Sequence, residues 1–280
     1  MATKKANTND FSEYKRKFWQ LFAYGFLGVI LLFLFASWGF FGKMPSFDDL
    51  ENPDSNVATE IISVDGVVIG KFYKENRTPV KYEELPQHLV KALVATEDER
   101  FYDHSGIDAK GTLRAVVKLG KDGGASTLTQ QLAKNLFHGE GSKFILFRVI
   151  QKVKEWIIAI RLERQYTKQE IIALYLNQVD FVNGAVGIRS AAKIYMNKEP
   201  KDLTIEEGAL FVGMLKNPSL YNPNRKKRAQ LVLDRRNTVL GQMVKNGVIT
   251  ESKKEELKKL PIKLDFKPES HSEGSATYFR

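Results

Sequence analysis

A stretch of 25 consecutive residues without a charged side chain, from Phe18 to Gly42, constrains this chain more than any other feature. It is dominated by Leu, Phe, Val and Ile and is long enough to cross the ~30 Å hydrocarbon core of a bilayer as a helix. It exceeds the apolar core of a cleavable signal peptide, and no small-x-small cleavage site follows it. We therefore predict one retained transmembrane helix. The alternative, a buried core helix, is disfavoured by the length.

Charges on the two sides of this stretch predict its orientation. The segment from Met44 to Gly70 carries six acidic residues and no Lys or Arg, whereas the preceding flank carries Lys4, Lys5, Lys15, Arg16 and Lys17. The positive-inside rule then puts the N-terminus in the cytoplasm and everything after about residue 43 outside the cytoplasmic membrane. Nucleic acid is therefore not an expected partner for the formal net charge of +10, which anionic lipid or a phosphorylated substrate fits better.

The rest of the chain predicts one mainly α domain. A short β-hairpin is expected around the Asp65-Gly66 turn. Helical periodicity then covers residues 86–101, 127–137, 143–165, 168–178, 187–196, 204–215 and 228–246. The expected divisions are a cytoplasmic tail (1–17), the anchor (18–42), a stalk (43–60), the domain (61–260) and an extended exit (261–280). The absence of Cys excludes disulfide scaffolds, thiolate zinc sites and cysteine nucleophiles.

A glutamate occupies a core-facing position in the first of these helices. The apolar stripe of that helix consists of Val90, Leu93, Val94 and Phe101. Glu97 lies within this stripe, and burying a carboxylate costs free energy unless the group is paired, so Glu97 is a candidate for chemistry. Its neighbours Asp98, Arg100 and His104 are placed to orient it. The alternative is that the helix ends here and Glu97 pairs with Arg100.

The second predicted helix begins after a glycine turn at residues 123–124. Ser126 or Thr127 is the expected N-cap, and Thr127 with Gln130 fits a capping box. Opposite a leucine stripe, the helix is expected to present Thr127, Gln130, Gln131 and Lys134. Hydroxyl, amide and ammonium groups near a helix N-terminus suit a phosphate or pyrophosphate. The alternative is a well-capped helix with a solvated face.

The third predicted helix carries Lys152 and Glu155 at i, i+3 on one side. That spacing favours a surface ion pair worth a few tenths of a kcal/mol. Upstream, residues 144–147 are apolar all round and either rest on a bilayer or belong to the core. Other signals fail: residues 182–187 lack the first Gly of a dinucleotide fingerprint, and the histidines show no metal-ligand spacing.

Taken in order, these motifs resemble the peptidoglycan glycosyltransferase domain, family 51 of the glycosyltransferases, found in class A penicillin-binding proteins and monofunctional transglycosylases. The similar segments are residues 97–106, 124–135, 151–155, 170–177, 184–195 and 217–223. The departures from the family pattern are Gln151, where Arg is usual, Ala173, where an acidic residue is frequent, Val182 and Met196. The resemblance implies a lysozyme-like, mainly α fold with a smaller membrane-facing lobe.

The resemblance also implies roles for individual residues. Glu97 is expected to be the general base that deprotonates the acceptor 4-hydroxyl, and Glu155 the second essential carboxylate, which positions groups or assists at the pyrophosphate or a metal. The departure at Gln151 leaves Lys152, Arg148 and Lys143 as candidate phosphate contacts. The expected substrate-binding residues are Asp98, Arg100, Phe101, His104, Ser126, Thr127, Gln130, Gln131, Lys134, Asn135 and Lys152.

The implied reaction polymerises lipid II into β-1,4 glycan strands with inversion at the outer face of the cytoplasmic membrane and releases undecaprenyl pyrophosphate. No cofactor is expected to be required, although Mg²⁺ or Mn²⁺ is compatible, with Glu155 as a ligand. Expected partners are lipid II, the growing strand, the bilayer and other wall-synthesis proteins, without nucleic acid. Two other functions remain open: a lysozyme-like lytic enzyme, and a catalytically silent anchored scaffold. The run from Ser275 to Arg280 is similar to the start of a linker to a transpeptidase domain.

Overall fold

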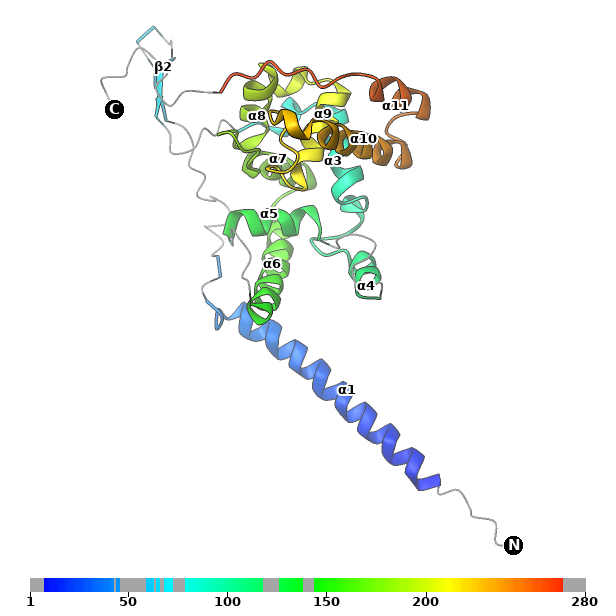
Figure 1. Ribbon diagram of the computed structural model, residues 1–280. Helices are drawn as coiled ribbons and strands as arrows, with labels where there is room; N and C mark the ends of the chain where they lie inside the picture. The colour runs from blue at the N-terminus through cyan, green and yellow to red at the C-terminus, as the bar shows by residue number, and fades with distance from the viewer. Residues whose placement is uncertain are drawn as a thin grey trace.

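The computed structural model describes residues 8–42, 44–45, 59–62, 64–65, 68–72, 79–117, 126–137 and 144–268. Its helices form an upper group, a lower group and one long helix that projects away from both (Figure 1). The predicted glycine turn at residues 123–124, the candidate phosphate contact Lys143, and most of the stalk lie outside the described residues.

The projecting helix is α1, Thr8–Ser37. Within it, Phe11–Ser37 is long and apolar enough to cross a membrane, and its most apolar part is not buried against the rest of the protein. Helix α1 starts before the predicted anchor and stops before the turn that holds Gly39 and Gly42, and the anchor boundaries of 18 and 42 stay a prediction. Both glycines have positive φ, +79° and +108°, a conformation that glycine adopts at little cost.

A two-stranded antiparallel sheet follows α1 along the chain. Strand β1, Thr59–Ile62, pairs with β2, Val68–Phe72, and the register is irregular between Ile61 and Ile62. Val64 and Asp65 form the described part of the turn between the strands. Gly66, on which the hairpin prediction partly depended, lies outside the described residues.

The upper group holds most of the hydrophobic core. Its helices are α3 (Gln87–Glu97), α7 (Lys168–Gln178), α8 (Gly187–Met196), α9 (Ile205–Leu215), α10 (Ala229–Lys245) and α11 (Glu251–Lys258). Thr167 with Glu170 and Thr204 with Glu207 make capping boxes that fix the starts of α7 and α9. Buried side chains from these helices form one continuous cluster that includes Leu93, Leu176 and Phe211.

The lower group consists of α4 (Ala109–Val117), α5 (Leu128–Phe137) and α6 (Ile145–Gln165). Helix α5 contacts both α6 and α7 and so joins the two groups (Figure 1). Helix α6 meets the end of α1, where Lys154 Nζ donates to the Phe41 and Gly42 carbonyls at 2.7 and 3.2 Å. The apolar run that was expected either to rest on a bilayer or to belong to the core is not part of the core. Exposed apolar side chains at the start of α6 are Ile145, Leu146, Phe147 and Val149.

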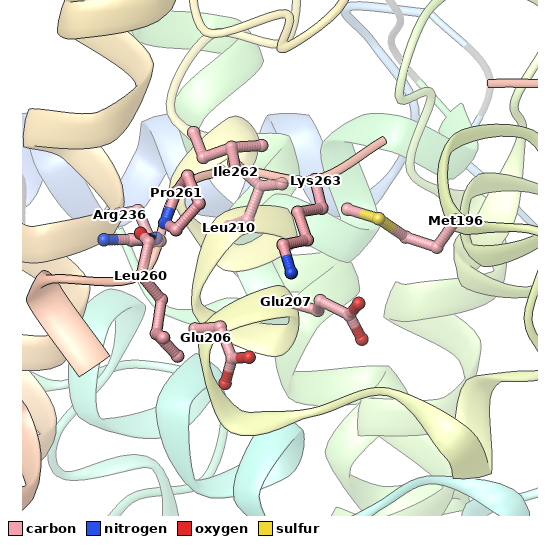
Figure 2. Close-up of a pocket in the computed structure, with 9 residues that line it drawn as sticks. All are labelled: Met196, Glu206, Glu207, Leu210, Arg236, Leu260, Pro261, Ile262 and Lys263. Carbon is pink, nitrogen blue, oxygen red and sulfur yellow. Dashed lines mark hydrogen bonds between the residues drawn. The ribbon is translucent and has the colours of Figure 1, made fainter. Parts of the chain in front are cut away.

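An extended segment, residues 261–268, runs along the upper group. Asp265 N and Lys267 N donate to the carbonyls of Tyr195 and Ile194 at 3.1 and 2.8 Å. A cavity of about 110 Å³ lies beside this segment, and Figure 2 shows Arg236, Leu210 and Lys263 in its wall. Arg236 is buried and donates to the carbonyls of Leu257, Lys258 and Leu260 at the end of α11. The guanidinium thus serves as a C-cap, and this cavity is separate from the site described next.

Candidate active site

Glu97 is the last residue of α3 and lies at the wall of a cavity of about 450 Å³. Asp98 leaves the helical conformation, and its N–H donates to the Val94 carbonyl, which ends α3 there. The Glu97 side chain is 16% exposed. The helix end predicted by the alternative interpretation is therefore present, but its partner was wrong, because Arg100 contacts Glu99 and Asp108 rather than Glu97.

Two side chains lie next to the Glu97 carboxylate, and a third is bonded to one of them. The three come from three other helices. Gln131 Nε2 on α5 donates to Glu97 Oε2 at 3.2 Å, and Tyr175 Oη on α7 donates to Gln131 Oε1 at 3.0 Å. Arg235 Nη2 on α10 lies 3.8 Å from Glu97 Oε1. Burial, followed by the negative charge of Glu97, raises the pKa of Tyr175, so its hydroxyl stays protonated. The carboxylate is held by hydrogen bonding and by a cation.

The cavity beside Glu97 is polar and rich in cationic groups. Its basic lining residues are Arg100, Arg114, Lys216, Arg235 and Lys245. Its acidic lining residues are Glu97, Asp98, Glu99 and Asp108. Lys245 Nζ lies 2.9 Å from Glu99 Oε2, and that hydrogen bond lowers the pKa of Glu99 against the opposing effect of burial. Such a lining suits a ligand that carries both hydroxyl and phosphate groups.

Asp98 and His104 fix the start of α5. Asp98 Oδ2 accepts from the Leu128 N–H at 3.0 Å, and His104 Nε2 lies 3.1 Å from both carboxylate oxygens of Asp98. The Asp98 carboxylate therefore occupies part of the helix N-terminus that was expected to receive phosphate. Both residues were predicted to bind substrate. In the structure Asp98 holds the backbone at the start of α5 and His104 contacts the Asp98 carboxylate, and a direct contact of either residue with substrate stays a prediction.

Thr127 and Gln130 lie inside the protein, not on an outer face of α5. Thr127 Oγ1 donates to the Gly106 carbonyl at 2.7 Å, and Gln130 Nε2 donates to the same carbonyl at 3.2 Å. Thr127 Oγ1 also accepts from the Gln130 N–H, so Thr127 is the N-cap. The expectation that Thr127 and Gln130 share an outer face with Lys134 was wrong. Both side chains are buried, because they satisfy the hydrogen-bonding capacity of the Gly106 carbonyl. Lys134 and Asn135 are exposed.

Phe101, another predicted substrate-binding residue, is fully buried. Lys168 Nζ lies 4.2 Å from the centre of its ring, a cation–π contact, and the His104 ring meets it edge-on. The side chain thus supports the loop after α3. The structure brings Phe101 close to the site without exposing its ring to the cavity.

Arg100 and Asp108 join the loop after α3 to α4. Arg100 Nε donates to Asp108 Oδ2 at 3.1 Å, and the Gly111 N–H donates to Asp108 Oδ1 at 2.9 Å. Burial favours a higher pKa for Asp108, but the hydrogen bonds from Arg100 and Gly111 outweigh it and lower the pKa. The hydrogen bond that Arg100 donates to Asp108 raises the pKa of Arg100 in turn. A Cβ on Gly111 would displace the Asp108 carboxylate from its present position.

Lys152 and Glu155 form a partly buried pair next to α5. Lys152 Nζ lies 3.1 Å from Glu155 Oε2 and donates to Ser126 Oγ at 2.8 Å. The Glu155 side chain is 8% exposed, so the predicted surface ion pair was wrong for this partner. Ser126 lines the cavity beside Glu97, so Lys152 is one hydrogen bond away from the cavity wall. Arg148, the other described candidate phosphate contact, is exposed on α6.

Some residues at the site were not predicted from the sequence. Arg235, Lys216, Gln242 and Lys245 reach the cavity from α10 and the end of α9, and Tyr175 reaches Glu97 through Gln131. Helical periodicity predicted both α7 and α10 but gave no sign that these side chains face Glu97. Within the described residues, no group of three or more His, Asp or Glu is placed to hold a metal ion.

The comparison with known families decides the classification. The family model described as Transglycosylase matches residues 65–244, which contain every site residue named above except Lys245. The chain belongs to the transglycosylase family. Within this family, penicillin-binding protein 1F of Bacillus subtilis (strain 168) is 42% identical over 203 residues, 70% of this chain and 27% of that protein.

Two further relatives are penicillin-binding proteins 1A. The protein of Pseudomonas aeruginosa is 35% identical over 243 residues, 85% of this chain and 29% of the relative. The protein of Escherichia coli (strain K12) is 37% identical over 213 residues, 75% and 24% of the two chains. A crystal structure of penicillin-binding protein 1A from Haemophilus influenzae superposes with a TM-score of 0.44 at 24% identity, covering 76% of this chain and 22% of that one.

This transglycosylase chain spans less than a third of the length of those relatives. Its matched region is a peptidoglycan glycosyltransferase domain of the kind that penicillin-binding proteins carry. The mainly α fold expected from the sequence is confirmed by the helices described above.

Proposed function

We propose that this transglycosylase polymerises lipid II into β-1,4 glycan strands with Glu97 as the general base. The observation that carries the proposal is the position of Glu97 at the wall of the polar cavity, held by Gln131 and Arg235. A fixed carboxylate facing a cavity large enough for sugar rings is suited to accept a proton from a bound hydroxyl.

In the proposed step, the 4-hydroxyl oxygen of the acceptor sugar attacks the anomeric carbon of the donor. A bond forms between that oxygen and the carbon as the bond from the carbon to the pyrophosphate oxygen breaks on the opposite side, which inverts the configuration. The hydroxyl proton passes to a Glu97 oxygen, and the electron pair of the broken bond leaves with undecaprenyl pyrophosphate. The two products are a lengthened glycan and that lipid pyrophosphate.

The negative charge that grows on the leaving pyrophosphate requires fixed positive charge. Lys152, bonded to Ser126 at the cavity edge, is the candidate for this role, and Glu155 holds its ammonium in place. Lys134 is exposed on α5, the same helix that begins after Ser126. Arg114 and Lys216 in the cavity lining supply further positive charge.

A divalent metal does not fit the described groups. Glu155, the expected ligand, is occupied by Lys152, and the described acidic residues of the cavity do not form a cluster suited to a metal. Asp108 is bonded to Arg100, and Asp98 to His104 and Leu128. We therefore derive no step through a metal ion, and the proposal uses carboxylate, amide, hydroxyl and basic groups.

The proposed reaction takes place at a membrane, because its substrate carries a lipid. Helix α1 has the length and composition of a membrane anchor, and the charge difference across it favours a cytoplasmic N-terminus with the domain outside. Apolar side chains exposed on α4 and α6 would then face the bilayer, as the smaller membrane-facing lobe: Leu113, Val117, Phe144, Ile145, Leu146 and Phe147.

The test is incubation of the full chain in detergent or vesicles with purified lipid II. We expect polymer formation, and a loss of about 10²- to 10⁴-fold in Glu97→Gln, because the amide is isosteric and cannot accept the proton. Glu256→Gln, on the exposed face of α11, is the matched control and should retain full activity.

Two results would replace this proposal by another function. Shortening of preformed glycan without any polymer from lipid II would indicate a lytic enzyme. If the wild type and Glu97→Gln polymerise at equal rates, Glu97 is not part of the chemistry. If neither protein makes polymer, the result removes Glu97 from the chemistry and favours a scaffold.

A further inference from the structure

Gln131 is held between a buried phenol and the Glu97 carboxylate. Its Oε1 accepts from Tyr175 Oη at 3.0 Å, and its Nε2 donates to Glu97 Oε2 at 3.2 Å. Tyr175 is 2% exposed and belongs to the hydrophobic core of α7. The buried hydroxyl of Tyr175 is thus linked through the Gln131 amide to the Glu97 carboxylate at the cavity wall.

The direction of these two hydrogen bonds is determined by chemistry. An ionised carboxylate only accepts hydrogen bonds, so the amide nitrogen of Gln131 must face Glu97 and the amide oxygen must face Tyr175. A flipped amide would set its oxygen against the carboxylate. The phenol favours the observed direction because it stays protonated in its buried site and offers a donor to the amide oxygen.

We propose that Tyr175 is a positioning residue, which orients the Gln131 amide so that Gln131 holds the Glu97 carboxylate toward the reacting hydroxyl. This inference rests on the proposed role of Glu97 as general base. It assigns Gln131 to the carboxylate, whereas the family resemblance implied a contact with pyrophosphate. Neither Tyr175 nor this orientation of Gln131 was expected from the sequence.

A purely structural role for Tyr175 is the competing explanation, since the side chain also fills core volume. The chain offers a matched control in Tyr195, which is fully buried in the same hydrophobic cluster. Tyr195 Oη donates to the Phe181 carbonyl at 2.8 Å and accepts from Asn183 Nδ2 at 3.0 Å. Loss of either phenol removes one buried hydroxyl, but only the Tyr175 hydroxyl is linked to Glu97.

The experiment compares Tyr175→Phe, Gln131→Met, the double variant and Tyr195→Phe in the full chain, with steady-state kinetics on lipid II and thermal unfolding. We expect kcat to fall about tenfold in Tyr175→Phe, with KM changed less than about twofold, because a positioning effect acts on the reaction step. Gln131→Met should lose at least as much, and the double variant no more than Gln131→Met alone. Tyr195→Phe should lower Tm and leave kcat unchanged.

The pH profile of kcat separates positioning from packing. Loss or misorientation of the Gln131 amide changes the surroundings of the Glu97 carboxylate, so the pH profile should differ from that of the wild type in Tyr175→Phe and Gln131→Met but not in Tyr195→Phe. The charged groups around Glu97 remain the same in all variants: Arg235 on α10, and the cavity residues Asp98, Glu99, Arg100, Asp108, Arg114, Lys216 and Lys245.

Three outcomes would overturn the inference. The first is a wild-type kcat in Tyr175→Phe. The second is a fold-loss of kcat in the double variant that equals the product of the two single fold-losses. The third is a loss of kcat in Tyr195→Phe as large, relative to its loss of Tm, as the loss in Tyr175→Phe. Each is distinguishable from failure of the proposed function, in which the wild type makes no polymer or Glu97→Gln keeps its activity.

Discussion

Gly106 connects the loop after α3 with the two helices beside it. Its φ is +89°, and a Cβ built on it would lie 2.9 Å from the carbonyl carbon and oxygen of Ala159 on α6. Its own carbonyl accepts from Thr127 and Gln130 at the start of α5. The position therefore combines a left-handed backbone, close approach to a helix and two buried hydrogen bonds.

Gly106→Ala should lower the free energy of unfolding by about 2–4 kcal/mol, through the strained φ and the collision with α6. Denaturant unfolding of the full chain in detergent measures this loss. Gly184→Ala is the matched control, since Gly184 also has positive φ (+79°) but nothing lies within 4 Å of its Cβ position. Its loss should be about 1 kcal/mol. Equal losses in the two variants would show that the contact with α6 contributes nothing.

At the scale of single residues, local helix patterns indicated Glu97, Ser126 and Gln131, and the family resemblance added Lys152 and Glu155. All five lie at or beside the cavity. Arg235 and Tyr175 were missed because their relation to Glu97 exists only after α7 and α10 pack against α3 and α5. The direction of a side chain on a correctly predicted helix depends on tertiary packing.

Among the helices, those with an apolar stripe were predicted well, and those without one were missed. The ranges expected for α7 and α8 agree with Lys168–Gln178 and Gly187–Met196. Helix α11 was missed because it buries only Leu257 and is instead supported by the Thr250 cap and by ion pairs three residues apart. Helix α4 was missed because it is only nine residues long and contains Gly111, which lowers helix propensity.

Helix α4 depends on Asp108, which caps it and bonds to Arg100. Asp108→Asn keeps a capping oxygen but removes the charge, so we expect a loss of about 1–2 kcal/mol of unfolding free energy at pH 7. Because the folded pKa of Asp108 is lowered, this stabilisation is present above the ordinary value of 3.8 and is lost as the pH falls through the lower folded value.

Urea unfolding in detergent at pH 7 and near pH 3 checks this prediction. The difference between the wild type and Asp108→Asn should shrink at the lower pH, whereas Asp202→Asn, an exposed carboxylate in the upper group, should differ little from the wild type at both. A difference that stays constant with pH would mean that the charge of Asp108 does not contribute.

The whole molecule offers a direct test of which face meets the bilayer. The chain has no Cys, so one introduced cysteine can carry a spin label without a background signal. A label at Ile145→Cys, an 81% exposed position at the start of α6, should be accessible to oxygen dissolved in the lipid and protected from a water-soluble relaxation agent. A label at Leu231→Cys on α10 should show the reverse. Equal access of the aqueous agent to both positions would contradict the membrane-facing lobe.

The junction of α1 with α6 gives the molecule a mechanical property. Lys154 donates to carbonyls in the turn that follows α1, and Arg161 Nη1 donates to the Pro45 carbonyl at 3.2 Å. The rings of Trp156 and of Phe33 on α1 have their centres 6.1 Å apart. The same helix, α6, carries Lys152 and Glu155 between and beside these contacts. The groups proposed to hold the pyrophosphate thus lie on the helix that contacts α1, so a change in the angle between α1 and α6 would move them.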